Sequence, residues 1–306
     1  MADEDADVYL AYHTLTVVAV VFAVHNLPLD TVNMLFYMEL IHFLSIAIAC
    51  IEHYCLVFGQ YSGGEVLSLF VIADLHLSLS ADKPMDIFSG WTDHVARLEK
   101  NWQERVEPDD TVVIPGDISW AMSLSDALED FKFIDRLNGH KIIVKGNHDY
   151  WWSTVSKAER LFRENGIGSI NILHNNFYRF GDNIGICGTR GWINDGSEPK
   201  DRKVILREAQ RLERSVGAAV SVGCRPVAFL HYPPIFMDDR NDEIMDVLKK
   251  RRVRHCFCGH LHGYAHKCAF IGEFEGIEFR LISSDFLHFC PLDITNLVES
   301  NEKQIF

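Results

Sequence analysis

The sequence predicts an α/β fold in which parallel strands come first along the chain and antiparallel strands follow them. From residue 67 onward, short apolar runs of strand length alternate with segments that repeat apolar residues at helical spacing. Residue types that bind metals come directly after several of these runs. Residues 267–295 instead alternate apolar and polar side chains, with Gly272 and Gly276 as turn points, which is typical of antiparallel strands.

Three strand–loop–helix units account for the first half of this region. We expect strands at 67–73, 111–114 and 140–144, because each is an apolar run suited to burial on both faces of a sheet. The helices are indicated by apolar spacing around 95–106, by a capping-box pattern that starts at Ser123, and by a periodic segment from Val155 that stops at Asn165-Gly166.

The second half continues the alternation. An apolar strand at 183–189 leads into a loop that contains Arg190, and a charged amphipathic helix is expected at 201–215. A strand at 225–230, a helix near 242–250 and a strand at 254–258 follow. The order of elements therefore favours crossover connections between parallel strands before the antiparallel tail.

Composition limits the class of protein. The chain has 306 residues, 48% of them hydrophobic, which is enough for one sizeable globular domain. Its formal net charge of −14 argues against a protein whose main task is to coat nucleic-acid phosphates. The eight cysteines are scattered through apolar runs, so we expect reduced thiols and a cytoplasmic location.

Residues 1–66 differ in composition from the rest of the chain. They contain no Lys or Arg and include two apolar segments, 9–24 and 34–58. An acidic start is unlike a secretory signal, and the second segment carries acidic and histidine residues that a membrane span avoids. We favour the hypothesis that this extension comes from a mis-called start, with Leu67 as the native first residue; a membrane-associated segment is the alternative. The functional domain is predicted at 67–306.

Polar residues that can bind metal ions follow the predicted strands. Because right-handed crossovers bring the carboxyl ends of parallel strands to one edge of a sheet, we expect these residues to lie together. Carboxylate, imidazole and amide groups in this combination suit a pair of divalent transition-metal ions. The residues concerned are Asp74, His76, Asp117, Asn147, His148, His231, His260 and His262.

The motifs that contain these residues resemble those of the calcineurin-like metallophosphoesterase family. In chain order they are Asp-x-His, Gly-Asp, Gly-Asn-His-Asp, a lone His after a strand, and Gly-His-x-His, spread over residues 67 to about 265. The resemblance implies a four-layer α/β/β/α sandwich of two mixed sheets flanked by helices. It also implies hydrolysis of a phosphate mono- or diester with two metal ions, which could be Mn²⁺, Fe²⁺/Fe³⁺ or Zn²⁺.

The resemblance further implies a role for each motif residue. One metal ion would be held by Asp74, His76 and His262, and the other by Asn147, His231 and His260. Asp117 would bridge the two ions, and a hydroxide between them would attack phosphorus. His148 would assist the leaving group, and Asp149 would orient His148.

Two further residues are candidate substrate contacts. Arg190 follows a strand and could pair with a substrate phosphate, although a surface ion pair is an equal alternative. Trp151, with the aromatic residues on either side of it, could line the substrate pocket, and burial in the core is the competing interpretation.

Two other clusters have simpler explanations. Cys256 and Cys258 lie close in sequence to His260 and His262 and could form a structural zinc site, but an apolar strand predicts core packing for both cysteines. The basic run 249–254 closes a predicted helix, where cations favour the helix dipole.

We expect an enzyme whose substrate is a small phosphorylated compound, with nucleic acid relevant only as a substrate. The alternatives are a catalytically silent scaffold on the same fold and a membrane-tethered phosphoesterase. The sequence does not specify an oligomeric state.

Overall fold

The computed structural model describes residues 67–192 and 199–299. The predicted extension, residues 1–66, lies outside the described residues. Within them, none of the helices combines the length and the apolar character that crossing a membrane requires.

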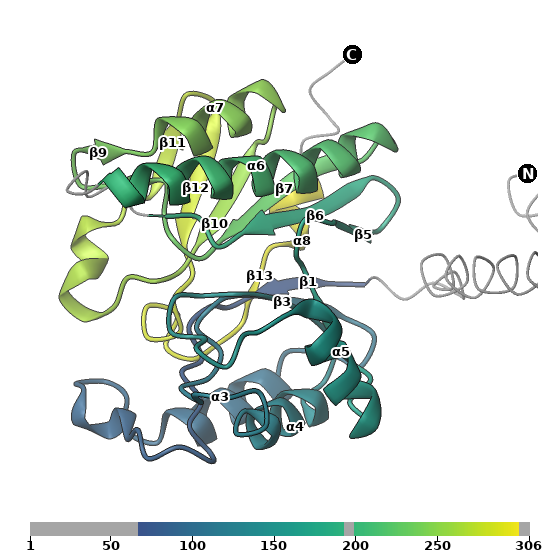
Figure 1. Cartoon of the computed structure of the whole chain (residues 1–306), viewed down its shortest axis with the longest axis vertical. Helices are drawn as coiled ribbons and strands as arrows, with labels where there is room; N and C mark the ends of the chain where they lie inside the picture. The colour runs from purple at the N-terminus through teal and green to yellow at the C-terminus, as the bar shows by residue number, and fades with distance from the viewer. Residues whose placement is uncertain (1–66, 193–198, 300–306) are drawn as a thin grey trace, which may run out of the picture. The chain divides into compact units, whose positions relative to one another are not determined.

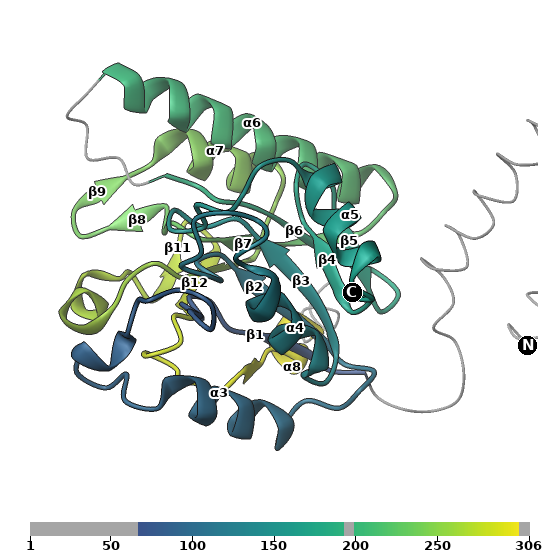
Figure 2. The same cartoon turned by 60° about the horizontal axis from the view of Figure 1, so that its bottom comes forward.

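Two mixed sheets pack face to face and helices cover their outer faces (Figure 1). The first sheet has the strand order β13-β1-β2-β3-β4, and the second has the order β11-β12-β10-β7-β6-β5. Helices α3, α4 and α5 lie on the outer side of the first sheet, and α6 and α7 on the outer side of the second (Figures 1 and 2). The fold is therefore the predicted α/β arrangement of two mixed sheets flanked by helices.

The first sheet is parallel except at one edge. The last strand along the chain, β13, runs antiparallel to β1, and the other neighbours are parallel. Its strands are β1 (Leu69–Val71), β2 (Thr111–Pro115), β3 (His140–Val144), β4 (Ile170–Ile172) and β13 (Leu292–Asp293). The helices beside it are α3 (His94–Gln103), α4 (Leu128–Arg136) and α5 (Val155–Glu164), with α8 (Thr295–Glu299) at the end of the chain.

The second sheet has four central parallel strands and an antiparallel strand at each edge. Its strands are β5 (Tyr178–Phe180), β6 (Ile184–Thr189), β7 (Arg225–Leu230), β10 (His255–Cys258), β11 (Gly272–Phe274) and β12 (Ile277–Leu281). The long α6 (Pro199–Ser221) and α7 (Asp242–Lys250) cover it. The smaller elements are the hairpin β8 (Ile235–Phe236) and β9 (Asp239–Arg240) and the 3₁₀ helices η2 (Met85–Ile87) and η3 (Gly263–Cys268).

Strand alternation explains the apolar runs. In β1, Leu69 and Val71 belong to the core between the two sheets, whereas Phe70 and the following Ile72 pack beneath α3 and α4. Successive side chains of a strand point to opposite faces, so a strand buried on both faces must be apolar throughout. The same alternation places Cys256 and Cys258 under α6 and α7, with their Sγ atoms 3.7 Å apart, which confirms the core interpretation.

Several element boundaries differ from the sequence prediction. The Ser123 hydroxyl accepts a hydrogen bond from the Asp126 backbone N–H, as a cap does, but regular helix begins only at Leu128. Helix α6 is longer than expected, and the short strands β4 and β5 were not predicted. In the tail, β12 is antiparallel to β11, as expected, but pairs in parallel with β10.

Candidate metal centre

The loops after β1, β2 and β3 of one sheet and after β7 and β10 of the other meet at one end of the sandwich. Two groups of side chains converge there, each with possible ligand atoms within 4.8 Å of one another. The first group is Asp74, His76 and His262, and the second is Asp117, His231 and His260. Every one of these residues was predicted from its place after a strand.

Asp117 lies between the two groups. Its Oδ2 atom is 3.8 Å from Nε2 of His76 in the first group and 3.5 Å from Nε2 of His231 in the second. The predicted amide ligand also reaches this point, since Oδ1 of Asn147 is 2.5 Å from His231 Nε2. The structure thus brings together all seven residues predicted to bind metal.

The hydrogen bonds of His231 show that the second group fits a cation. Its Nδ1 is 3.2 Å from the Pro115 carbonyl oxygen and 3.3 Å from Asp74 Oδ1, so this nitrogen carries the ring proton. Nε2 and the Asn147 amide oxygen are then both acceptors, 2.5 Å apart, and a cation that accepts both lone pairs would satisfy them. Although burial opposes it, Asp117 and Asp74 raise the pKa of His231 to about 9, which reflects the same demand for positive charge.

The first group has the same character. Nδ1 of His262 donates to Asp285 Oδ1 at 2.8 Å, which leaves the Nε2 lone pair facing Nε2 of His76 at 3.2 Å. The buried Oδ1 atom of Asp74 makes no well-directed hydrogen bond among the described residues, since its nearest donor, His231 Nδ1, is 3.3 Å away and also faces the Pro115 carbonyl. Converging lone pairs and an unsatisfied buried carboxylate oxygen are what a metal ion would satisfy. The residues present therefore fit two divalent cations.

His260 is kept neutral and ready to act as a ligand. Burial and the charge of His231 lower the pKa of His260 to about 3. Its ring packs on Tyr232 at a centroid distance of 4.2 Å, and its backbone N–H donates to Asp74 Oδ2 at 2.8 Å. This last bond ties the loop after β10 to the loop after β1, across the two sheets.

Backbone geometry explains why glycine precedes two of the candidate ligands. A Cβ atom on Gly146 would lie 2.1 Å from Asp117 Oδ1, and one on Gly259 would lie 2.6 Å from Asp74 Oδ2. Asp74, His76, Asp117 and His260 all adopt positive φ values between 46° and 73°, a conformation that non-glycine residues rarely take. Such strain is concentrated at functional sites, where the surrounding structure over-determines it.

Asp149 has a different role from the one expected. Its buried carboxylate accepts hydrogen bonds from the backbone N–H groups of Gly146, Ile118 and Ser119 and from the indole of Trp151, and among the described residues none of its hydrogen bonds involves His148. The expectation that Asp149 orients His148 is therefore corrected. Asp149 instead pins the loop after β3 to the loop after β2.

His148 lies beside the metal centre, and aromatic neighbours hold it there. Its backbone N–H donates to Asp117 Oδ1 at 2.8 Å, and its Nδ1 is 3.3 Å from the Tyr150 hydroxyl. The ring packs against Trp120 at a centroid distance of 4.4 Å, and the same indole stacks on His76 at 4.9 Å. Burial lowers the pKa of His148, which favours a neutral imidazole that can donate a hydrogen bond.

The two candidate substrate contacts lie in different surroundings. Trp151 is 2% exposed and packs edge-on against Phe131 in the core, so it offers no surface to a substrate in this structure. Its neighbour Trp152 lines a pocket instead, and so does Arg190. Arg190 also lies 3.9 Å from Glu208, a longer contact than a hydrogen bond.

Some residues at the site carried no recognisable motif. Asp285 follows β12 and fixes His262, and Trp91 packs edge-on against His76 and His262. Neither has a spacing that relates it to the ligands. Tyr232 could have been suspected, because it directly follows a predicted ligand.

The centre and the fold define a metal-dependent hydrolase of the α/β class. The model of the calcineurin-like phosphoesterase family matches residues 67–264, and the chain belongs to that family. Membership implies metal-dependent hydrolysis of a phosphoester. The comparison with curated proteins found no match.

Three of the solved structures with a similar fold are the following. A protein of unknown function from Aquifex aeolicus is 14% identical, with 77% of this chain and 100% of that chain covered and a TM-score of 0.43. The phosphopantetheinyl hydrolase of Mycobacterium tuberculosis is 16% identical, with 72% and 90% covered and a TM-score of 0.42. A purple acid phosphatase from yellow lupin is 11% identical, with 72% and 44% covered and a TM-score of 0.38.

Proposed function

We propose that this chain hydrolyses a phosphate mono- or diester of a small compound with two divalent metal ions. The observation that carries the proposal is the pair of possible ligand groups, with Oδ2 of Asp117 close to a histidine of each, 3.8 Å from His76 and 3.5 Å from His231. Asp74, His76 and His262 would hold one ion, Asn147, His231 and His260 the other, and Asp117 would contact both. When bound, the ions supply positive charge that neutralises the phosphoester and activates water for attack.

The chain's own residues supply orientation and a proton donor. Hydrogen bonds that Nδ1 of His262 donates to Asp285 and Nδ1 of His231 donates to the Pro115 carbonyl leave the Nε2 lone pair of each ring free to bind a metal ion. His148 would donate a hydrogen bond or a proton to the leaving oxygen, with Trp120 and Tyr150 limiting the motion of its ring. Asp149 keeps the loops of Asp117 and Asn147 in register.

The test is a panel of phosphomonoesters and phosphodiesters assayed with Mn²⁺, Fe²⁺ or Zn²⁺. His148→Ala should lower kcat by roughly 10²–10⁴-fold on the substrates that the wild type cleaves, the range typical of a lost acid–base catalyst. His140→Ala, at an exposed position at the start of β3, is the matched control and should leave kcat unchanged. Equal activity of the His148→Ala variant and the wild type on every substrate would remove the proposed role of His148.

A further inference from the structure

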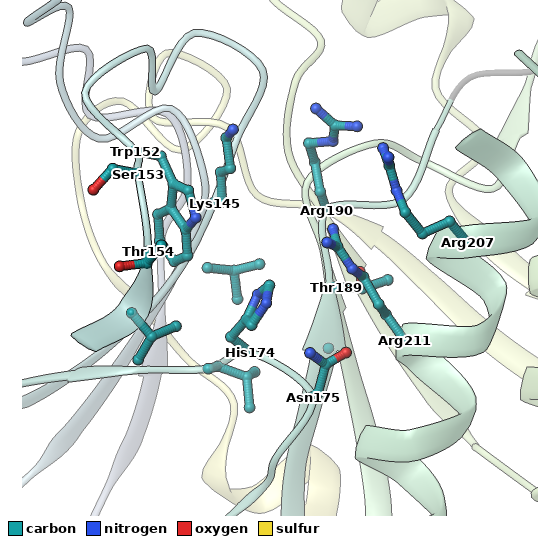
Figure 3. Close-up of a pocket in the computed structure, with 14 residues that line it drawn as sticks. Lys145, Trp152, Ser153, Thr154, His174, Asn175, Thr189, Arg190, Arg207 and Arg211 are labelled. Carbon is teal, nitrogen blue, oxygen red and sulfur yellow. The ribbon is translucent and has the colours of Figure 1, made fainter. Parts of the chain in front are cut away.

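A basic pocket opens beside the metal centre, at the side of the sandwich where β3, β4 and β6 end. Its volume is about 470 Å³. We call it the basic pocket and define it by Lys145, Trp152, His174, Arg190, Arg207 and Arg211. Figure 3 shows Lys145 and Trp152 on one wall, the three arginines on the other, and His174 with Asn175 between them.

Among the described residues, cations outnumber anions in the basic pocket. Glu208 is fully buried and is the carboxylate that its arginines share, with Oε1 at 2.8 Å from Arg211, 3.5 Å from Arg207 and 3.9 Å from Arg190. The second carboxylate oxygen of Glu208 accepts a 2.6 Å hydrogen bond from Thr189. One carboxylate therefore faces three guanidinium groups, and Lys145 adds a fourth positive charge from the opposite wall.

Part of this excess positive charge is shielded from solvent. The Arg190 side chain is 16% exposed, and burial lowers the pKa of its guanidinium group. The buried Nε atom of Arg190 has no hydrogen-bond partner among the described residues. Partly buried like charges and an unsatisfied buried donor cost stability, and a polyanion with several acceptor oxygens would relieve both costs.

Residues on both walls of the basic pocket lie close to candidate metal ligands. Lys145 lies two residues before Asn147, so their Cα atoms are separated by at most about 7.6 Å. On the other wall, the backbone N–H of Tyr232, which directly follows His231, donates to the carbonyl oxygen of Arg190 at 2.8 Å. A single small molecule could therefore reach both places.

We propose that the basic pocket binds a second phosphate group of the substrate, so that the enzyme acts on a compound with two separate phosphate groups. One phosphoester would lie at the metal centre, and the other phosphate would be held by Arg190, Arg207, Arg211 and Lys145. Three guanidinium groups suit a phosphate better than a carboxylate, because its three free oxygens accept several paired hydrogen bonds and its double charge offsets more of the excess positive charge. The proposal rests on the phosphoesterase function proposed above.

Kinetics test the proposal with a substrate pair: a nucleoside 5′-monophosphate and the corresponding nucleoside 3′,5′-bisphosphate, assayed with the metal-loaded full chain. The wild type should prefer the bisphosphate in kcat/KM. Arg211→Gln should reduce that preference about tenfold or more, the equivalent of one lost charge-assisted hydrogen bond. Arg214→Gln, an exposed residue of the same helix that does not line the basic pocket, should keep the wild-type preference.

Binding of inorganic phosphate, followed by calorimetry, gives a readout that does not need turnover. Arg211→Gln should weaken phosphate binding about tenfold, and Arg214→Gln should not. Lys145→Met removes a charge from the opposite wall and replaces Arg211→Gln if that variant does not fold. Unchanged binding in these variants, or no binding to the wild type, would overturn the pocket proposal. Phosphate binding without hydrolysis of any ester would instead count against the proposed function.

Discussion

Gly146→Ala is expected to disable the metal centre while leaving the fold intact. The added Cβ would lie 2.1 Å from Asp117 Oδ1 and 2.2 Å from the Asp117 backbone nitrogen. The first distance falls 1.3 Å short of the 3.4 Å at which ordinary van der Waals contact begins. Asp117 cannot move away freely, since its Oδ1 also accepts the hydrogen bond from the His148 N–H at 2.8 Å. Either the loop after β3 or Asp117 must shift by about an ångström.

The size of the effect follows from that displacement. Overpacking typically costs about 1–3 kcal/mol, which is less than the roughly 5–15 kcal/mol that stabilise a domain, so the variant should fold. A 1 Å displacement of a catalytic group can cost about 10²-fold, and Gly146→Ala should lose at least that much in kcat/KM. It should also retain less metal, because Asp117 and Asn147 would no longer face a common point.

The assay combines phosphoester hydrolysis, metal content by elemental analysis and thermal unfolding. Gly168→Ala is the matched control, because a Cβ there meets nothing within 4 Å. It should match the wild type in all three measurements. Full activity and full metal content in Gly146→Ala would refute the inference that close approach of the two loops requires glycine at this position.

Three further predictions concern the centre and the domain that supports it. Asp285→Asn should lower metal affinity by about 10–100-fold, measured by metal titration, because Asp285 orients His262 through Nδ1; an affinity equal to wild type would contradict this role. Removal of metal by a chelator should abolish hydrolysis. Mn²⁺ at 100 times its Kd should raise the free energy of unfolding by about 2.7 kcal/mol, and an unfolding temperature that does not change with added Mn²⁺ would rule out the proposed centre. The Arg251 side chain lowers the pKa of Glu213, so the ion pair stabilises the fold above the ordinary glutamate pKa and this stabilisation is lost as pH falls through the lowered value. Glu213→Gln should therefore cost up to about 1 kcal/mol near neutral pH, and the cost should shrink progressively as the pH falls below the ordinary glutamate pKa of about 4.3. Urea unfolding at neutral and acidic pH measures this cost, and an equal cost at both pH values would contradict the role of the ion pair.

Local pattern was sufficient for most of the fold. The apolar runs that became β1, β2, β3, β7 and β10 are buried on both faces, and this burial leaves a continuous signature in the sequence. Strands β4 and β5 escaped prediction because each is short and has a polar residue at its centre, Asn171 or Arg179, so neither forms the continuous apolar run that marks β1. The boundary of α4 was misplaced because Ser123 forms a capping hydrogen bond to a turn that precedes the helix.

The candidate ligands could be grouped from the sequence because each one lies in a loop that follows a strand, and parallel strands end at a shared edge. The partners of those ligands were not predictable. Asp285, Trp91 and Trp120 reach the centre from positions with no fixed spacing to it, and the carboxylate of Asp149 turns toward backbone amides rather than toward His148.

The sequence by itself determined the family, the succession of strands and helices, and which side chains could bind metal, because these depend on local order along the chain. Only the tertiary structure decided that Asp117 lies between the two ligand groups, that Trp151 is core while Trp152 lines a pocket, and that Arg190 joins two arginines of α6. These outcomes depend on how two sheets and a long helix pack against one another. Such packing sets distances between residues that are remote in sequence, and no local pattern encodes them.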